Sequence, residues 1–434
     1  MTNLVVGYLS LIAICVTIYA GIHIAVALSL VSMLGIWLMM GQPHLALVFV
    51  AQAVTESIAN YLFGVVPLFI LMGLVVAESG MGRDTFAVVS HYLRGVRGGL
   101  GVATVLSNAI FAAVTGISIA SAAVFARIAV PEMVRAGYDR RIAVGVVAGS
   151  SVLGMLIPPS LLMIFFAFLT DTSIGDLFLG GVGPGLLLTA AYSLYLLALG
   201  RLQPHRLEPA GKRGEPEARP KRRMLLPVFA LAALVLGGIY AGFFTPTEAG
   251  AIGAFLAILF AMLMRRIGLR EAWRITLETG HITASISLLI IGATIYSRML
   301  SLSGVPASLT AWAAGSGLGP IGVMLLFSLL LILLGTILDS GSILLVTVPL
   351  AFPIAMQLGI DPVHFGLVTV IAVEIGLLTP PLGLSVFVVH STLRDTGVTL
   401  GEVFRGALPF AAVMTAVLLA VIFYPPIVLA IIGR

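Results

Sequence analysis

The sequence Gly154-Met-Leu-Ile-Pro-Pro159 returns 222 residues later as Gly376-Leu-Leu-Thr-Pro-Pro381. Each copy lies inside a long apolar run, and each follows another apolar run that small and polar residues interrupt. Downstream, Gly175-Asp-Leu-Phe178 is matched by Gly401-Glu-Val-Phe404. The interrupted run, the Pro-Pro run and the Gly-acid-x-Phe sequence occur in the same order in both places. Coincidence could produce one Pro-Pro pair but hardly the whole series, so the pattern indicates two internal repeats.

The composition is that of a membrane protein. Only 9% of the 434 residues are charged, 60% are hydrophobic and the mean hydropathy is +1.15, whereas a soluble domain carries about 25% charged residues. So few charges cannot coat a soluble particle of this size, which excludes a soluble enzyme, a nucleic-acid binder and a disordered protein. The single cysteine, Cys15, allows no disulfide framework. The N-terminus lacks the positive region of a signal peptide, so its apolar run is expected to be a retained first span.

Ten apolar runs are long enough to be full spans, since an apolar helix needs about 20 residues to cross a bilayer. Two more runs, 98–130 and 321–357, are broken centrally by Thr115-Gly-Ile-Ser118 and Asp339-Ser-Gly-Ser342. Non-helical backbone at membrane depth is tolerated only inside protein or beside a cavity, so these two runs are predicted to be re-entrant hairpins. The predicted spans are 4–20, 22–40, 58–79, 142–170, 177–199, 224–241, 248–264, 282–300, 363–391 and 406–430, with the Pro-Pro breaks in 142–170 and 363–391.

The basic residues fall on one side of this arrangement. If the hairpins do not cross, five alternate loops hold 20 of the 23 Lys and Arg residues, and the other five loops hold none. The positive-inside rule makes the basic loops cytoplasmic and both termini periplasmic. The first repeat then starts outside and the second inside, which is the inverted architecture of secondary transporters. The basic loops are 80–99, 131–141, 200–223, 265–274 and 392–405, and the loops without Lys or Arg are 41–57, 171–176, 242–247, 301–320 and 358–362.

The chain is therefore expected to be an all-α polytopic protein of two repeats. The hydrophilic stretch 201–223 has 11 charged residues, four prolines and no periodic apolar face, so it is predicted to be a cytoplasmic linker. The predicted domains are the first repeat at 1–200, this linker, and the second repeat at 224–434.

The breaks have a chemistry of their own. A Pro-Pro pair removes two backbone donors and frees carbonyl groups of the preceding turn. Those carbonyls and the hydroxyls of a hairpin tip suit a small cation, while the helix N-termini after each break suit an anionic group. The breaks thus predict a cation and a carboxylate bound together. The alternative is that the prolines only kink the helices for packing.

At these motifs the chain resembles the large membrane subunit of tripartite ATP-independent periplasmic (TRAP) transporters, DctM-like members of the ion transporter superfamily, over nearly its whole length. The resemblance implies sodium-coupled uptake of an organic acid by an elevator mechanism in the bacterial inner membrane. It also implies two partners, a small four-helix membrane subunit and a periplasmic solute-binding protein, with no cofactor beyond the coupling ion and no enzymatic activity. The residues that carry the resemblance are 67–73, 128–133, 137–140, 156–160, 244–249, 338–342, 361–366 and 374–381.

Two sodium sites are predicted at the breaks, because sodium is a hard cation that favours oxygen ligands. Five residues are predicted to contact the substrate. Three of these depart from the family or are ambiguous: Ser385 stands where the family often has Asn, and Arg127 and Arg298 could each instead snorkel or form a structural ion pair. The sodium ligands are Gly116, Ser118, Gly154 and Pro158 at the first break and Asp339, Ser340, Ser342, Gly376 and Thr379 at the second; the substrate ligands are Ser118, Ser160, Arg127, Ser385 and Arg298.

Two acids inside the predicted membrane region and one motif carry predictions of their own. Acids inside a membrane are costly and indicate function, so Asp339 is assigned to the cation or substrate site. For Glu374 two roles are possible: it belongs to the cation or substrate site, or it pairs with a buried hydrogen-bond donor. Thr245-Pro-Thr-Glu248 predicts a helix capping box.

Transport is expected to move 98–175 and 321–395 against a fixed scaffold of 4–40, 177–199, 224–264 and 406–430. A single-component carrier of the same superfamily, working without a binding protein, is the alternative. A membrane enzyme would need a convergent set of His, Cys or acidic groups, which the predicted spans lack.

Overall fold

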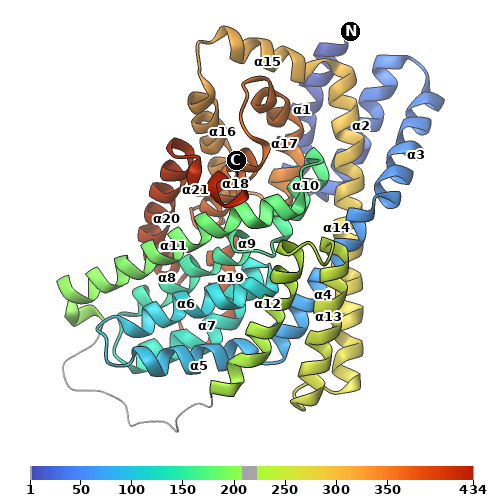
Figure 1. The fold of residues 1–434 in the computed structure, drawn as a ribbon. Helices are drawn as coiled ribbons and strands as arrows, with labels where there is room; N and C mark the ends of the chain where they lie inside the picture. The colour runs from blue at the N-terminus through green and yellow to red at the C-terminus, as the bar shows by residue number, and fades with distance from the viewer. Residues whose placement is uncertain (1, 208–221, 434) are drawn as a thin grey trace.

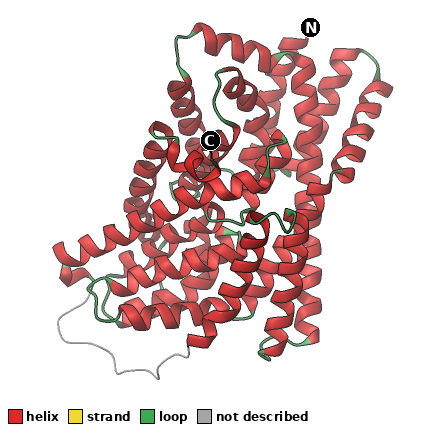
Figure 2. Ribbon diagram, in the orientation of Figure 1, coloured by secondary structure: helices red, strands yellow, loops and turns green. Residues whose placement is uncertain are grey.

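The computed structural model describes residues 2–207 and 222–433, and within these ranges the secondary structure is helical with no strand (Figure 2). This confirms the all-α class. Most of the predicted linker 201–223 lies outside the described residues.

Both halves run through helices in the same order. Two apolar helices come first, then a long helical segment, a short helix, a hairpin, a broken span and a last long helix. The first half contains α1 (Asn3–Tyr19), α2 (Ile24–Met40), α3 (Pro43–Ala59), η1 (Tyr61–Gly64), α4 (Val65–Glu78), α5 (Met81–Leu93), α6 (Gly99–Thr115), α7 (Ser118–Arg135), α8 (Arg140–Ser151), α9 (Leu153–Leu156), α10 (Leu161–Thr170), α11 (Ile174–Leu202) and η2 (Pro204–Arg206). The second contains η3 (Arg222–Leu225), α12 (Leu226–Tyr240), α13 (Pro246–Leu263), α14 (Leu269–Ser303), α15 (Val305–Gly315), α16 (Pro320–Gly335), α17 (Ser340–Gln357), α18 (Pro362–Gly376), α19 (Leu384–Thr392), η4 (Arg394–Thr396), α20 (Leu400–Phe423), α21 (Pro426–Leu429) and η5 (Ala430–Ile432).

The two halves pack on each other reciprocally. Helix α2 of the first half packs on α14 of the second, and α13 of the second packs on α4 of the first. In the same way α10 packs on α17, and α19 packs on α7 (Figure 1). Corresponding elements thus exchange places across the molecule, as two related repeats would. The inverted hand of the repeats stays a prediction.

Helix length supports part of the predicted span count. In the described residues, six helical segments are long and apolar enough to cross a membrane, or seven if the bent pair α4–α5 counts as one span. The predicted spans at α1, α2, α12 and α18 are apolar helices of 15 to 17 residues. The total of ten spans stays a prediction.

Several segments differ from the predictions, among them the predicted loops 80–99 and 301–320, which contain the helices α5 and α15. The segment 41–57, predicted to be a loop, is almost wholly helical as α3, since its polar residues lower its hydropathy without breaking a helix. Helix α14 begins at Leu269 inside a predicted loop and runs for 35 residues. The predicted span 406–430 is interrupted after Phe423, where two prolines follow Tyr424.

The predicted capping box is present at the start of α13. The Glu248 N–H donates to the Thr245 hydroxyl (3.3 Å), and the Thr245 N–H donates to the Glu248 carboxylate (2.8 Å). Two otherwise unpaired donors of the helix start are thereby satisfied, which confirms the prediction from sequence.

The five predicted basic loops touch one another in a continuous series. Two of them, around α5 and the α13–α14 turn, form the lower end of the molecule in Figure 1, opposite the N-terminus. The contacts that join the five are Asp84–Arg266 (2.6 Å), Asp139–Arg206 (3.1 Å), Arg140 with the Thr396 carbonyl, and the Arg97 backbone against Gly200. Loops that were grouped by charge alone therefore lie together.

Close glycine contacts join the last long helix of each half to the broken span of the first half. A Cβ on Gly145 of α8 would lie 2.1 Å from the carbonyl oxygen of Gly406 of α20, and one on Gly181 of α11 would lie 3.1 Å from that of Leu156. Helices α11 and α20 thus pack directly on the broken spans, and the predicted assignment of 177–199 and 406–430 to the fixed scaffold stays a prediction. We call α6–α11 with α16–α20 the broken-helix body, and α1, α2, α4 and α12–α14 the scaffold body.

Candidate functional site

In the first half, the hairpin tip at 116–118 is fastened to the break at 157–160, and we call this contact junction one. The Leu161 N–H donates to the Gly116 carbonyl (3.3 Å). Gly116 has a φ of 66°, and a Cβ there would lie 2.6 Å from the Pro159 carbonyl oxygen. A Cβ on Gly154 would lie 3.0 Å from Ile117 and Ser118 backbone atoms. Gly116 therefore requires glycine and Gly154 packs tightly on the tip, and these contacts bring together the predicted ligands Gly116, Ser118 and Gly154.

The serines of junction one are fully buried. The Ser160 hydroxyl donates to the Met155 carbonyl (2.5 Å) and accepts from the Met163 N–H (3.4 Å). Ser160 therefore caps the N-terminus of α10, whose positive end points toward the break. Its role as a substrate ligand stays a prediction.

In the second half, the tip at 336–340 is fastened to the break at 377–383, and we call this contact junction two. The Leu382 N–H donates to the Thr336 carbonyl (2.9 Å), which parallels the bond in junction one. A Cβ on Gly376 would lie 2.5 Å from the Cα of Gly335, so α16 and α18 meet backbone to backbone. The Thr379 hydroxyl donates to the Gly376 carbonyl (2.9 Å) within the break.

Asp339 sits at the tip of junction two. Its half-buried carboxylate accepts the Ser342 N–H (3.1 Å) and the Ser342 hydroxyl, so it is the N-cap of α17. Ser340 and Ser342, both predicted ligands, are buried in the first turn of that helix. In the structure Asp339 therefore acts as a helix cap, at the position where the sequence predicted a cation ligand.

Glu374 joins the two junctions. Its fully buried carboxylate accepts the Ser118 hydroxyl of the first half (2.8 Å) and the Ser340 hydroxyl of the second (3.5 Å). Of the two interpretations left open by the sequence, pairing with buried donors is the one observed. The Ser118 contact spans 256 residues, so no local sequence signal could have identified it.

The remaining predicted substrate ligands are dispersed. Ser385 is fully buried, and its hydroxyl has no hydrogen-bond partner among the described residues. Arg127 is exposed on α7, nine residues beyond Ser118, or about 13 Å along the helix axis. Arg298 of α14 forms an ion pair with Glu56 of α3, which is the structural alternative weighed for it. Neither arginine is in contact with a junction.

The model of the tripartite ATP-independent periplasmic transporter family, DctM component, matches residues 11–427. The chain belongs to this family. It is 36% identical over 377 residues to the C4-dicarboxylate TRAP transporter large permease protein DctM of Pseudomonas aeruginosa, covering 87% of each chain. It is 31% identical over 381 residues to the sialic acid TRAP transporter large permease protein SiaM of Vibrio cholerae, again covering 87% of each.

The fold of this TRAP permease is similar to that of a solved transporter. The crystal structure of the Alcanivorax borkumensis YdaH transporter matches with a TM-score of 0.55 and 14% identity, covering 85% of this chain and 88% of that one. At this identity the likeness concerns the fold alone. Together with the apolar helices, the family identifies the permease as a multi-pass membrane protein.

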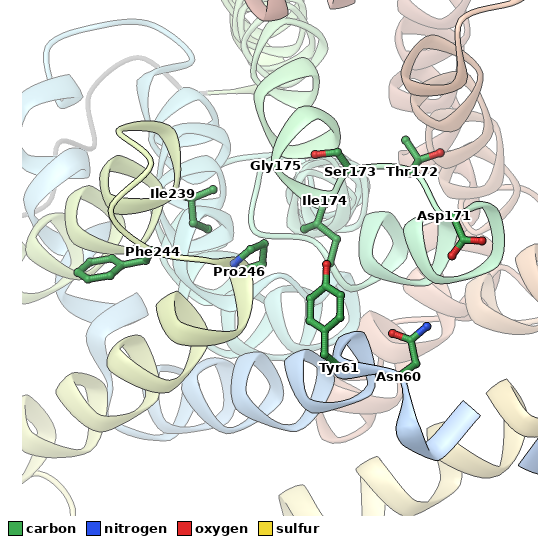
Figure 3. Close-up of a pocket in the computed structure, with 10 residues that line it drawn as sticks. All are labelled: Asn60, Tyr61, Asp171, Thr172, Ser173, Ile174, Gly175, Ile239, Phe244 and Pro246. Atoms are coloured by element: carbon green, nitrogen blue, oxygen red, sulfur yellow. The ribbon is translucent and has the colours of Figure 1, made fainter. Parts of the chain in front are cut away.

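A cavity of about 450 Å³ lies where the two bodies of the permease meet (Figure 3). The α10–α11 turn forms one side, and the scaffold forms the other. None of the predicted sodium or substrate ligands lines it. Its lining residues are Asn60, Tyr61, Asp171, Thr172, Ser173, Ile174, Gly175, Ile239, Phe244 and Pro246.

Proposed function

We propose that this permease is the large subunit of a sodium-driven uptake system for an organic acid, with sodium bound at junctions one and two. One observation carries the proposal: in each half a backbone hydrogen bond fastens a hairpin tip to a proline break, Leu161 to Gly116 and Leu382 to Thr336. Broken helices that meet in this way are the places where secondary transporters bind substrate and coupling ions.

The ligands available at the junctions suit sodium. Hard cations prefer carbonyl, hydroxyl and carboxylate oxygens. Junction one offers neutral oxygens from Gly116, Ser118 and Gly154. Junction two adds the carboxylate of Asp339 to the hydroxyls of Ser340, Ser342 and Thr379.

The substrate is proposed to be a carboxylate. The N-termini of α7, α10 and α17 lie at the junctions, and their positive ends favour an anionic group. The buried Ser385 hydroxyl, which has no partner in the described part of the chain, is a further donor. Relatives are named for C4-dicarboxylate and for sialic acid, both of which are carboxylic acids.

Transport is proposed to proceed by an elevator motion of the broken-helix body against the scaffold body. All junction residues belong to the first body, so moving it as a unit carries the site intact. The bodies meet closely at Gly73 of α4, where a Cβ would lie 2.6 Å from the Thr115 carbonyl oxygen at the tip of junction one. The cavity in Figure 3 lies on the same boundary, where a sliding motion would change its volume.

The proposed location is the bacterial inner membrane, with the basic loops in the cytoplasm and both termini in the periplasm. The partners are a small four-helix membrane subunit and a periplasmic binding protein, as the word tripartite in the family description suggests. A single-component carrier is the second candidate, and the fold shared with YdaH is compatible with either.

The test is uptake into proteoliposomes that contain this permease and its small subunit, with the binding protein and a radiolabelled dicarboxylate or sialic acid outside. We expect accumulation with an inward sodium gradient and none when potassium replaces sodium. Omitting the binding protein should abolish uptake. Equal uptake in potassium would overturn sodium coupling, and full uptake without the binding protein would favour the single-component carrier.

A further inference from the structure

Glu374 contacts both hairpin tips at the same point of their helices. Ser118 is the first residue of α7 and Ser340 is the first residue of α17. One carboxylate oxygen accepts from Ser118 (2.8 Å) and the other from Ser340 (3.5 Å). A displacement of either tip therefore changes the position or the hydrogen bonds of a group that also holds the other tip.

The link is made by one residue and has no counterpart in the other half. Glu374 lies two residues before Gly376, and the residue two before Gly154 is Val152, which is also fully buried. The first half forms its tip-to-break contact with an apolar residue at this position. An acid is thus not required to build a junction, and Glu374 serves something that involves both junctions.

The surroundings of Glu374 leave the two serine hydroxyls as its hydrogen-bond partners among the described residues. The carboxylate is fully buried, and no basic side chain in the described part of the chain lies within ion-pairing distance. Burial of a polar group without hydrogen-bond partners is costly. The hydroxyls of Ser118 and Ser340, at the N-terminal ends of α7 and α17, are the partners that offset this cost for Glu374.

We infer that Glu374 is a positioning residue that couples the two sodium sites, so that an ion at one junction strengthens binding at the other. This inference rests on the proposed function. Sodium at junction one fixes the tip that carries Ser118, Glu374 transmits that order to Ser340, and junction two is then already arranged for its ion. Coupling between sites is reciprocal, so the same holds in the opposite direction.

The experiment measures uptake against sodium concentration with the complete three-component system, for wild type, Glu374→Gln and Thr369→Val. The glutamine keeps the shape, but its amide nitrogen cannot accept a hydrogen bond, so only one of the two serine hydroxyls can still donate to it. Thr369 is the matched control, because it is fully buried on α18 and its hydroxyl donates only to the Phe365 carbonyl of its own helix (2.7 Å).

We expect a Hill coefficient above one for wild type and for Thr369→Val. For Glu374→Gln it should fall toward one, and the sodium concentration for half-maximal uptake should rise about tenfold, within the usual range for coupled sites. A purely structural role would lower the maximal rate or the melting temperature and leave the Hill coefficient unchanged. If Glu374→Gln does not transport, the melting temperature in detergent is measured against sodium concentration instead, because a bound ligand stabilises the folded state. The curve of the variant should then be less steep than that of wild type and have its midpoint at a higher sodium concentration.

The possible failures are distinguishable. A wild-type Hill coefficient above one that is unchanged in Glu374→Gln overturns the coupling role and leaves sodium-driven transport intact. A wild-type coefficient of one overturns the coupling as well. Uptake by wild type that does not depend on sodium overturns the proposed function, and with it the sites that Glu374 would couple.

Discussion

Junctions one and two share a backbone design and differ in chemistry. In both, a backbone carbonyl of the hairpin tip accepts a hydrogen bond from a backbone N–H that follows shortly after a Pro-Pro pair. Pro158 and Pro159 are buried, whereas Pro380 and Pro381 are exposed. The second half also contains Asp339, one residue before Ser340, and Glu374, two residues before Gly376, whereas the residues at the matching positions of the first half, Ile117 and Val152, are apolar.

This difference separates the residues that form a junction from those that determine its chemistry. Glycine and proline fix the path of the chain and occur in both halves. The carboxylates occur in one half only, so the construction of a junction does not require them. We therefore expect changes at the shared positions to abolish transport and changes at the carboxylates to alter its sodium dependence.

The largest expected effect comes from joining the two bodies. The Phe69 ring of α4 lies 6.1 Å from that of Phe178 of α11, across the boundary, whereas Tyr195 and Phe410 lie 5.3 Å apart within the broken-helix body. Each pair is replaced by cysteines after Cys15→Ser, and the pair is bridged with Hg²⁺. Bridging the first pair should abolish uptake, and bridging the second should not. Uptake that survives the first bridge would rule out the elevator motion.

Gly116→Ala should reduce uptake nearly as much. The added Cβ would lie 2.6 Å from the Pro159 carbonyl oxygen at a φ of 66°, so the tip must separate from the break. Gly237→Ala is the control, because nothing lies within 4 Å of a Cβ there. We expect uptake below about a tenth of wild type, because the backbone strain and the lost contact between tip and break together cost several kcal/mol. Wild-type uptake by Gly116→Ala would show that the tip need not contact the break.

Much of this architecture could be predicted from the sequence. Proline and glycine act locally, so the breaks, both hairpin tips and the capping box at Thr245 were visible in the pattern. The distribution of Lys and Arg predicted that the five basic loops lie on the same side of the protein. Helix α3 was missed because hydropathy reports burial in lipid and not helix formation. The two contacts of Glu374 could not be predicted, because they depend on how distant helices pack.

A smaller effect is expected for the substrate. Ser385→Ala removes a buried hydroxyl that has no partner among the described residues, so it should raise the KM for the organic acid and leave the sodium dependence unchanged. The loss of one neutral hydrogen bond predicts a change of about two- to tenfold. Ser391→Ala on the same helix is the control, because its hydroxyl bonds the Val388 carbonyl of α19 (3.0 Å). An unchanged KM would remove Ser385 from the substrate site.

The smallest effect concerns a helix cap away from the junctions. Thr399 caps α20 and exchanges hydrogen bonds with Glu402 (3.0 and 3.3 Å). Thr399→Ala should lower stability by about 1 kcal/mol, the usual value of a cap, without changing the sodium dependence of uptake. Thermal unfolding in detergent measures the first quantity. A change in sodium dependence would mean that loss of a cap alone can imitate loss of an ion ligand.

The most direct test of sodium binding at junction two is the sodium dependence of Asp339→Asn. Asparagine is as good an N-cap as aspartate, so the variant keeps the cap of α17 and loses only the negative charge. If Asp339 is a sodium ligand, the sodium concentration for half-maximal uptake should rise about tenfold or more, which corresponds to about 1.4 kcal/mol of lost binding. If the variant follows the wild-type sodium curve, Asp339 is only a cap, and the carboxylate of junction two does not bind the coupling ion.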